Sequence, residues 1–381
     1  MRDAVIVEAA RSAVGRRNGV LADLHPVDLS AQILLALSRR TGMDPALVED
    51  VIWGCGGQVG DQALNIGRSA VLAAGWPESV PGTTIDRQCG SSQQAVHFAA
   101  AGLVAGHYDV VVAGGVESMS RVPMGSTVQG GTPYGPLVAA RYDGTSFHQG
   151  VSAQLVADRW QLSRTQMDEF ALRSHQAAAE ASDAGLFTEE IVPVTNSAGD
   201  VVVADEGIRR GGTVQTLGAV RSAYQENGDI TAANSSQISD GAAALLMMTS
   251  ERAADLGLEP IARVHTAVLA AEDPVLMLAA PIPATRKALH KAGLTVDDIG
   301  AFEVNEAFAS VPLAWLAELG ADPDRLNSNG GAIALGHPIG GSGARIMTTL
   351  LHRMQQGGLR YGLQTMCEGG GMANATILEL I

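Results

Sequence analysis

The sequence is poor in cysteine, and the spacing of its three cysteines excludes two kinds of site. Cys55, Cys89 and Cys367 are odd in number, lie far apart and show no metal-ligand spacing. They therefore predict neither a disulfide framework nor a metal site. Isolated cysteines are typical of a reducing compartment, so we expect a cytoplasmic protein that uses its thiols singly.

Positive charge is scarce as well. The 25 lysine and arginine residues stand against 40 aspartate and glutamate residues, which gives a net charge of −15. Nucleic acid and anionic membranes are therefore not expected as partners, because the average surface would not attract either. An anionic substrate would need a local basic site.

Long apolar runs are also missing. The first ten residues carry Asp3 and Glu8 inside an apolar run, so we expect neither a signal peptide nor a membrane span there. Every later run is interrupted by charge or glycine before it reaches spanning length. With 381 residues, of which 46% are hydrophobic, the chain can still bury a large core and form more than one domain.

What the chain does have, in its first part, is an alternation of apolar strands with helices. The predicted elements are a strand at 4–9, a helix at 27–40, a strand at 49–54, a helix at 63–74, a short strand before Cys89, a helix at 93–106 and a strand at 109–115. This alternation predicts an α/β fold whose central sheet is covered on both faces.

The composition then changes to glycine, proline, serine and threonine, with only short helices predicted at 151–160 and 165–184. We expect a loop domain at 117–236 that carries binding contacts, as insertions on α/β scaffolds usually do. The N-terminal half would comprise 1–116 and 237–260, and the C-terminal half 261–381.

The last third of the chain repeats the pattern of the first. A helix, a glycine, an acidic pair and a strand lead to residues 51–53, and the same series leads to a strand at 299–304. The elements at 93–114 likewise have counterparts at 341–366. Two copies of one half would bring equivalent strand ends together, so a site between the halves could draw on both.

Cys89 lies where a short apolar run gives way to the helix at 93–106. A thiol at this point feels the positive end of the helix dipole and the unpaired N–H groups of the first turn. Both lower the pKa of a thiol, so we expect a nucleophilic thiolate near neutral pH. The alternative is that Cys89 is a small buried hydrophobic residue.

Four short motifs fall at strand or helix ends of the two halves. Singly they are weak, because a glutamate often caps a helix, a histidine often sits in a loop, and glycines serve turns. In this order across a duplicated α/β chain they are specific. They are Cys89-Gly90-Ser91, Asn305-Glu306-Ala307-Phe308, Gly336-His337-Pro338-Ile339-Gly340 and Cys367-Glu368-Gly369-Gly370-Gly371.

With these motifs the chain resembles the thiolase family over essentially its whole length. The resemblance implies a duplicated αβαβα layered fold and an acyltransferase that breaks or makes the carbon–carbon bond of a 3-oxoacyl-CoA. It implies acyl-CoA and CoA as substrates, no permanently bound cofactor, and a homodimer or homotetramer.

The resemblance also implies roles for the motif residues. Cys89 matches the acyl-accepting nucleophile, His337 the activating histidine and Cys367 the acid/base cysteine. Asn305 matches the residue that holds a water of one oxyanion hole, and the N–H groups of Cys89 and Gly369 match the second. These types suit thiolysis, which needs one sulfur as nucleophile and a second that protonates an enolate.

Four further residues match substrate-binding positions of the family. His148 and Phe308 match the substrate pocket, Arg209 a contact with the nucleotide end of CoA, and Ser236 a contact with the pantetheine arm. Arg209 would supply the local positive charge that the acidic chain otherwise lacks. Without the family, a solvated arginine and a turn serine would serve as well.

The sequence departs from common family patterns at Ser92, Gln149 and Gln237, which we expect to reshape the acyl pocket. The loops at 88–94, 281–286 and 364–368 are similar to those of degradative thiolases associated with steroid breakdown in actinobacteria. The length of the acyl group cannot be read from them.

Three alternatives remain open at this point: a biosynthetic acetoacetyl-CoA thiolase, a ketoacyl synthase and a non-catalytic CoA or lipid carrier. A ketoacyl synthase would lack a second catalytic cysteine, and a carrier would need none of Cys89, His337 and Cys367. Cys55 and His97 are interpreted as packing residues.

Overall fold

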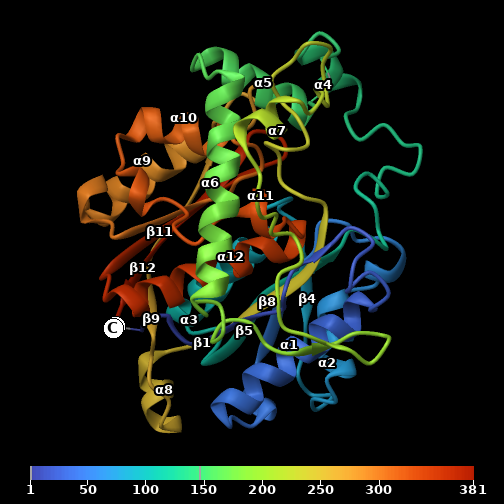
Figure 1. Ribbon diagram of the computed structural model, residues 1–381. Helices are drawn as coiled ribbons and strands as arrows, with labels where there is room; N and C mark the ends of the chain where they lie inside the picture. The colour runs from blue at the N-terminus through green and yellow to red at the C-terminus, as the bar shows by residue number, and fades with distance from the viewer. Residues whose placement is uncertain (1, 146) are drawn as a thin grey trace.

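The computed structural model describes residues 2–145 and 147–381. Within this range one sheet of ten strands forms the centre of the molecule (Figure 1). Its spatial order is β10 (Ala301–Val304), β11 (Tyr361–Glu368), β12 (Met372–Leu380), β9 (Ala262–Ala271), β1 (Val5–Arg11), β8 (Ser239–Met248), β5 (Val110–Ser118), β3 (Asp50–Gly54) and β4 (Thr83–Ile85), with β2 (Gly15–Arg16) beside β8.

The two sides of this sheet have matching topology. From β1 outward, β8 and β5 pair antiparallel and β3 pairs parallel with β5. From β9 outward, β12 and β11 pair antiparallel and β10 pairs parallel with β11. Among the described residues, the strand pairing between these two halves of the sheet consists of Val5 with Arg263 and Ile6 with Ala262, where β1 meets β9. The predicted duplicated α/β fold is confirmed.

Helices α3 (Ser91–Ala105) and α12 (Ile339–Gly357) lie against each other and cover one face of the sheet. Their close approach requires a glycine, because a methyl group on Gly343 of α12 would overlap the backbone of Gln93. The N-terminal ends of these two helices carry Cys89 and His337, so the packing that holds the helices together also sets the site.

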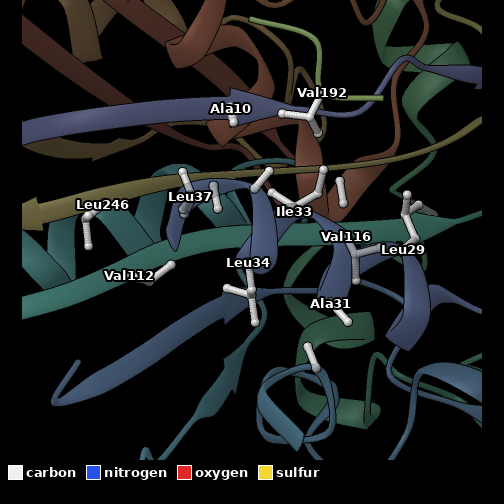
Figure 2. Close-up of a cluster of buried hydrophobic side chains, with 14 of the residues drawn as sticks. Ala10, Leu29, Ala31, Ile33, Leu34, Leu37, Val112, Val116, Val192 and Leu246 are labelled. Atoms are coloured by element: carbon white, nitrogen blue, oxygen red, sulfur yellow. The ribbon is translucent and has the colours of Figure 1, made fainter. Parts of the chain in front are cut away.

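The opposite face of the sheet is covered by α1 (Pro26–Thr41) and α9 (Pro281–Ala292), with α2 (Ile66–Ala73) packed on α1 and α10 (Ser310–Leu319) on α9. Leu34 and Leu37 of α1 pack towards Val112 of β5 and Leu246 of β8 (Figure 2). The alternate β5 residue Val111 belongs to the core on the α3 side. Strands buried on both faces explain the continuous apolar runs in the sequence.

The remaining elements lie outside this frame. They are α4 (Pro136–Arg141), α5 (Gln149–Arg159), α6 (Arg164–Asp183), β6 (Val194–Thr195), β7 (Val201–Val202), α7 (Val214–Gly218), α8 (Ser250–Leu256), α11 (Ala332–Leu335) and the 3-10 helices η1 (Pro45–Leu47), η2 (Gly60–Gln62), η3 (Val296–Asp298) and η4 (Pro323–Arg325). The two helices predicted in the inserted segment are thus present as α5 and α6. Ser163 and Gln166 form a capping box at the start of α6. Helices α4, α5 and α7 gather at one end of the molecule, and α1 and α2 at the other (Figure 1).

Candidate active site

A cavity of about 700 Å³ opens at the N-terminal end of α3. Six of the predicted site residues line it, and they come from both sides of the sheet and from the inserted segment: Cys89, His148, Ser236, Phe308, His337 and Gly369. Cys367 and Asn305 are buried rather than part of the lining, and Arg209 is exposed outside it.

Cys89 is held in a tight turn just before α3. Gln88 has a φ of 50°, a left-handed conformation that is uncommon for a residue with a side chain. The hydroxyl of Ser91 accepts a hydrogen bond from the Arg87 N–H at 2.9 Å and donates to the Gln88 carbonyl at 2.6 Å. These bonds stabilise a turn that leaves Cys89 on the cavity wall, with 5% of its surface exposed.

The expectation of a thiolate near neutral pH does not hold in this structure. Burial raises the pKa of Cys89 well above its usual value, and the neighbouring Cys367 and Glu368 raise the pKa further. The Cys89 backbone N–H lowers the pKa, but less than burial raises it. In the resting site Cys89 is therefore a thiol, and it needs a base to become a nucleophile.

His337 is placed to be that base. Its Nδ1 lies 2.6 Å from the Ser342 hydroxyl oxygen, and the same hydroxyl donates to the Pro338 carbonyl at 2.9 Å. With the Ser342 proton given to Pro338, we assign the ring hydrogen to Nδ1, which leaves the lone pair on Nε2. Nε2 has no hydrogen-bond partner among the described residues. Burial, together with the positive charge of Arg345, lowers the pKa of His337 to about 3, so the resting imidazole is neutral. The same shift makes it a weaker base than a free histidine, so its protonation depends on the negative charge of the forming thiolate.

Cys367 and Asn305 lie at the ends of two paired strands, Cys367 near the end of β11 and Asn305 directly after β10. The Asn305 N–H donates to the Thr365 carbonyl at 3.1 Å, which brings the residue after β10 beside the end of β11. Burial and the charge of Glu368 raise the pKa of Cys367 to about 12, whereas the Asn305 side chain lowers it. Neither amide atom of the Asn305 side chain has another partner within the described residues.

Two backbone N–H groups complete the polar side of the cavity. Cys89 and Gly369 both line it, and the N–H groups of neither donate to a backbone or side-chain acceptor in residues 2–145 and 147–381. Gly369 begins the turn between β11 and β12, in which Gly370 and Gly371 have φ values of 85° and 78°. These left-handed values explain the glycine run after Cys367.

Aromatic and methionine side chains form the rest of the wall, and the sequence analysis missed most of them. The Tyr224 ring lies 5.6 Å from that of His148 and 5.8 Å from that of Phe308. The further apolar lining residues are Met119, Met124, Tyr134, Phe147, Ile238, Met277, Ile339 and Met372. The one feature of the sequence that could have indicated them is that Tyr134, Phe147 and Tyr224 lie in the inserted segment.

Ser236 and Gln237 connect the inserted segment to the C-terminal half. The Ser236 N–H donates to the Ala307 carbonyl at 2.9 Å, next to Phe308. The Gln237 side-chain nitrogen lies 2.9 Å from the Gly207 carbonyl and 2.8 Å from that of Ile333. The Gln237 side chain therefore joins the backbone at Gly207 to the backbone at Ile333, in addition to lining the cavity.

Neither a metal centre nor a membrane span was found in the part of the chain that the structure describes. No group of three or more histidine, cysteine, aspartate or glutamate side chains there could hold a metal ion. No helix there has the length and apolarity needed to cross a bilayer. The three cysteines are free.

Comparison with known proteins gives consistent matches over the whole chain. Residues 4–251 match the family model of the thiolase N-terminal domain and residues 258–380 that of the thiolase C-terminal domain. The steroid 3-ketoacyl-CoA thiolase FadA6 of Mycobacterium tuberculosis is 49% identical, over 100% of this chain and 94% of the relative. A 3-ketoacyl-CoA thiolase of Serratia proteamaculans is 43% identical over 100% of both chains. The crystal structure of the Bacillus anthracis acetyl-CoA acetyltransferase superposes with a TM-score of 0.92 at 37% identity, covering 100% of this chain and 99% of that one.

Proposed function

Because the chain belongs to the thiolase family and is a 3-ketoacyl-CoA thiolase, we propose that Cys89, His337 and Cys367 serve as its nucleophile, base and acid. Enzymes of this family cleave or form 3-ketoacyl-CoA with CoA as a substrate and without a bound cofactor. A ketoacyl synthase or a carrier is thereby set aside.

In the first half-reaction the His337 Nε2 takes the proton of Cys89, and the thiolate attacks the ketone carbon of the substrate. The protonated Nε2 and a water held by Asn305 then donate to the developing oxyanion. Collapse breaks the carbon–carbon bond, leaves the acyl group on Cys89 and releases acetyl-CoA as an enolate. Cys367 protonates this enolate, which its raised pKa supports because the thiol keeps its proton until it is needed.

In the second half-reaction the Cys367 thiolate removes the proton of incoming CoA. The CoA thiolate attacks the thioester on Cys89, and the N–H groups of Cys89 and Gly369 stabilise the second oxyanion. Collapse of this oxyanion releases the new acyl-CoA and the Cys89 thiolate, which takes back the proton that the His337 Nε2 has held since the first half-reaction. The observation that carries this proposal is the unpartnered Nε2 of His337 in the cavity that Cys89 also lines, with the buried Cys367 close enough to Cys89 to raise its pKa.

The assignment is tested by incubation with an acyl-CoA and mass spectrometry of the protein. Cys89→Ala should form no acyl-enzyme and lose thiolysis, as followed by the enolate absorbance of acetoacetyl-CoA. Cys55→Ala is the matched control, because Cys55 is equally buried but lies outside the cavity lining. An acyl adduct on a residue other than Cys89 would contradict the proposal.

The lining of the cavity favours an apolar acyl group. The volume of about 700 Å³ has to receive part of the CoA arm as well as the acyl group, and aromatic and methionine side chains form much of its wall. The similarity to the Mycobacterium tuberculosis relative, which is named a steroid 3-ketoacyl-CoA thiolase, supports a steroid-degrading role. We therefore expect a higher kcat/KM for branched or cyclic 3-oxoacyl-CoA esters than for acetoacetyl-CoA, and the reverse order would favour a biosynthetic acetoacetyl-CoA thiolase.

The remaining assignments complete the proposal. Ser236, His148 and Phe308 bind the substrate arm within the cavity, and Arg209 binds the nucleotide end of CoA from its exposed position. The domain division at 1–116 with 237–260, 117–236 and 261–381 is supported by the absence of large-sheet strands from the described residues 119–238. The free cysteines support a cytoplasmic location, and a homodimer or homotetramer is proposed from the family alone.

A further inference from the structure

A buried carboxyl group lies directly behind the candidate nucleophile. Glu368 follows Cys367 on β11, and because side chains alternate along a strand, the two point to opposite faces. The side chain of Glu368 is fully buried, and a methyl group on Gly90 would overlap its carboxyl. Glu368 therefore contacts the turn of Cys89 and Gly90 at its backbone.

This carboxyl lacks the hydrogen bonds that usually accompany burial. Neither Glu368 oxygen has a partner of full hydrogen-bond geometry among the described residues, although the Asn374 N–H is close enough to lower its pKa. Buried carboxyl groups are nearly always paired. The nearby Arg87 Nε and Asn374 Oδ1 are also unpaired there, while the Asn374 Nδ2 donates to the Gly90 carbonyl at 3.1 Å. The charged or titratable groups that face Glu368 are Arg87 and Asp86 from the loop before α3, together with Cys89 and Cys367.

We propose that Glu368 is a positioning residue that controls how readily Cys89 and Cys367 give up their protons, through its charge behind the Cys89–Gly90 turn. The proposal rests on the roles given above to the two thiols. A carboxylate at this place repels negative charge on both sulfurs, whereas the neutral acid does not. The neutral form therefore permits thiolate formation during the reaction, and the ionised form opposes it.

The protonated and ionised forms of Glu368 interconvert within a pH range that experiments can reach. Burial raises the pKa of Glu368 to about 8, while the positive charge of Arg87 acts in the opposite direction. Near neutral pH the carboxyl is mostly protonated, and above about pH 8 it gains a charge. As the pH rises through this value, ionisation of Glu368 pushes the thiol pKa values further up, so the groups titrate as a coupled set.

The test is the pH dependence of Cys89 alkylation by iodoacetamide, resolved from Cys367 by peptide mass spectrometry. The wild-type rate should rise over a wider pH range than a single titration gives. In Glu368→Gln, which keeps the size of the side chain, the midpoint should move down by about one pH unit. Alkylation should then be roughly tenfold faster between about pH 8 and the wild-type midpoint, and nearly unchanged at neutral pH, where the wild-type Glu368 is mostly protonated. Glu368→Asp, which keeps the charge, should remain closer to the wild type.

Glu379→Gln provides the matched control. Glu379 is a buried glutamate of β12 that pairs with Arg263 and Arg360 and lies opposite Tyr361, at the far end of β11 from Cys367. Six residues of strand place it about 20 Å away. Its removal should leave the Cys89 profile unchanged.

An unshifted midpoint in folded Glu368→Gln overturns the inference. If that variant does not fold, infrared titration of the wild type against Glu368→Asp decides instead, because Glu303, whose pKa burial also raises to about 8, contributes equally to both. A protonated carboxyl band that disappears near pH 8 and moves with the substitution supports the proposal, and identical bands in the two proteins overturn it. Alkylation does not require turnover, so the outcome is separate from that of the catalytic assignment. Thiolysis retained in Cys89→Ala would refute the assignment without changing the alkylation result.

Discussion

The Nδ1 of His337 and the hydroxyl of Ser342 lie 2.6 Å apart, across the first turn of α12. With the hydroxyl donating to the Pro338 carbonyl, we assign the ring hydrogen to Nδ1 and the lone pair to Nε2. The free Nε2 lone pair is thus a property of the helix start, and it exists before any substrate binds.

Ser342→Ala should lower kcat by about 10- to 100-fold, because the imidazole can then turn or change tautomer. The acylation burst should slow together with steady-state thiolysis. Thr348→Ala is the matched control, since Thr348 is a buried residue of the same helix whose hydroxyl bonds only to the Ala344 carbonyl. Equal losses in the two variants would show that Ser342 supports only the helix.

Cys89 and Cys367, which we propose to be catalytic, should separate by role. Cys367→Ser should still be acylated by a preformed acyl-CoA, though more slowly, while overall turnover falls by about 100- to 10,000-fold because serine cannot shuttle the proton. His337→Ala should impair both steps. Rapid-quench measurement of the burst alongside steady-state thiolysis distinguishes them, and complete loss of the burst in Cys367→Ser would contradict the division.

Gln237 and Gln149 should affect different properties, although both line the cavity. Gln237→Ala leaves the Gly207 and Ile333 carbonyls without their amide partner, which should cost about 1–3 kcal/mol of stability with the ratio of bulky to small substrates kept. Gln149→Ala should shift that ratio towards bulky substrates without a comparable loss. Thermal unfolding measures the stability, and kcat/KM for a bulky and a small 3-oxoacyl-CoA ester measures the substrate preference. If Gln237→Ala changes the substrate preference and Gln149→Ala does not, the two roles assigned here are wrong.

Acid should destabilise the protein partly through His97. Its Nε2 lies 2.7 Å from the Thr376 hydroxyl, and burial, with Arg87 and Lys291, lowers its pKa to about 3. An unfolded histidine titrates near 6.5, so between about pH 6.5 and pH 3 the unfolded chain binds one more proton at this residue than the native state. The free energy of unfolding therefore falls by about 1.4 kcal/mol per pH unit as the pH decreases through this window.

Urea unfolding at several pH values tests this contribution. His97→Gln should make the dependence of stability on pH shallower by one proton. Thr376→Val should lower stability but keep the wild-type slope, because it removes the contact and leaves the titrating group. An unchanged slope in His97→Gln would show that His97 is not responsible.

The regular α/β elements of the first half could be predicted because their strands are buried on both faces and appear as apolar runs. Strands β9 and β12 were not predicted. In β12 the apolar run is interrupted by Asn374 and Thr376, which are buried only because Gly90, Gln93 and His97 of the facing segment bind them. Such pairing joins residues almost 300 positions apart, and no local pattern reveals it.

The candidate site was likewise predictable where local motifs mark it, and not where distant parts of the chain form it. Motifs located Cys89, His337 and Cys367, because each stands at an element end that glycines mark. The direction of the Cys89 pKa shift was wrong, since helix position is a local property whereas burial depends on the whole fold. Tyr224 and Met277 were missed for the same reason, because only tertiary packing brings them to the cavity.

The position of β8 has a consequence for how the chain is made. β8 pairs with both β1 and β5, yet residues 119–238 separate it from β5 in sequence, a stretch of 120 residues. At about 5–20 residues per second, synthesis of that stretch takes roughly 6–24 s. During this time β1 and β5 lack the strand between them and present unpaired N–H and C=O groups along their edges. We therefore expect the nascent N-terminal half to be more prone to pair with other chains than the completed protein.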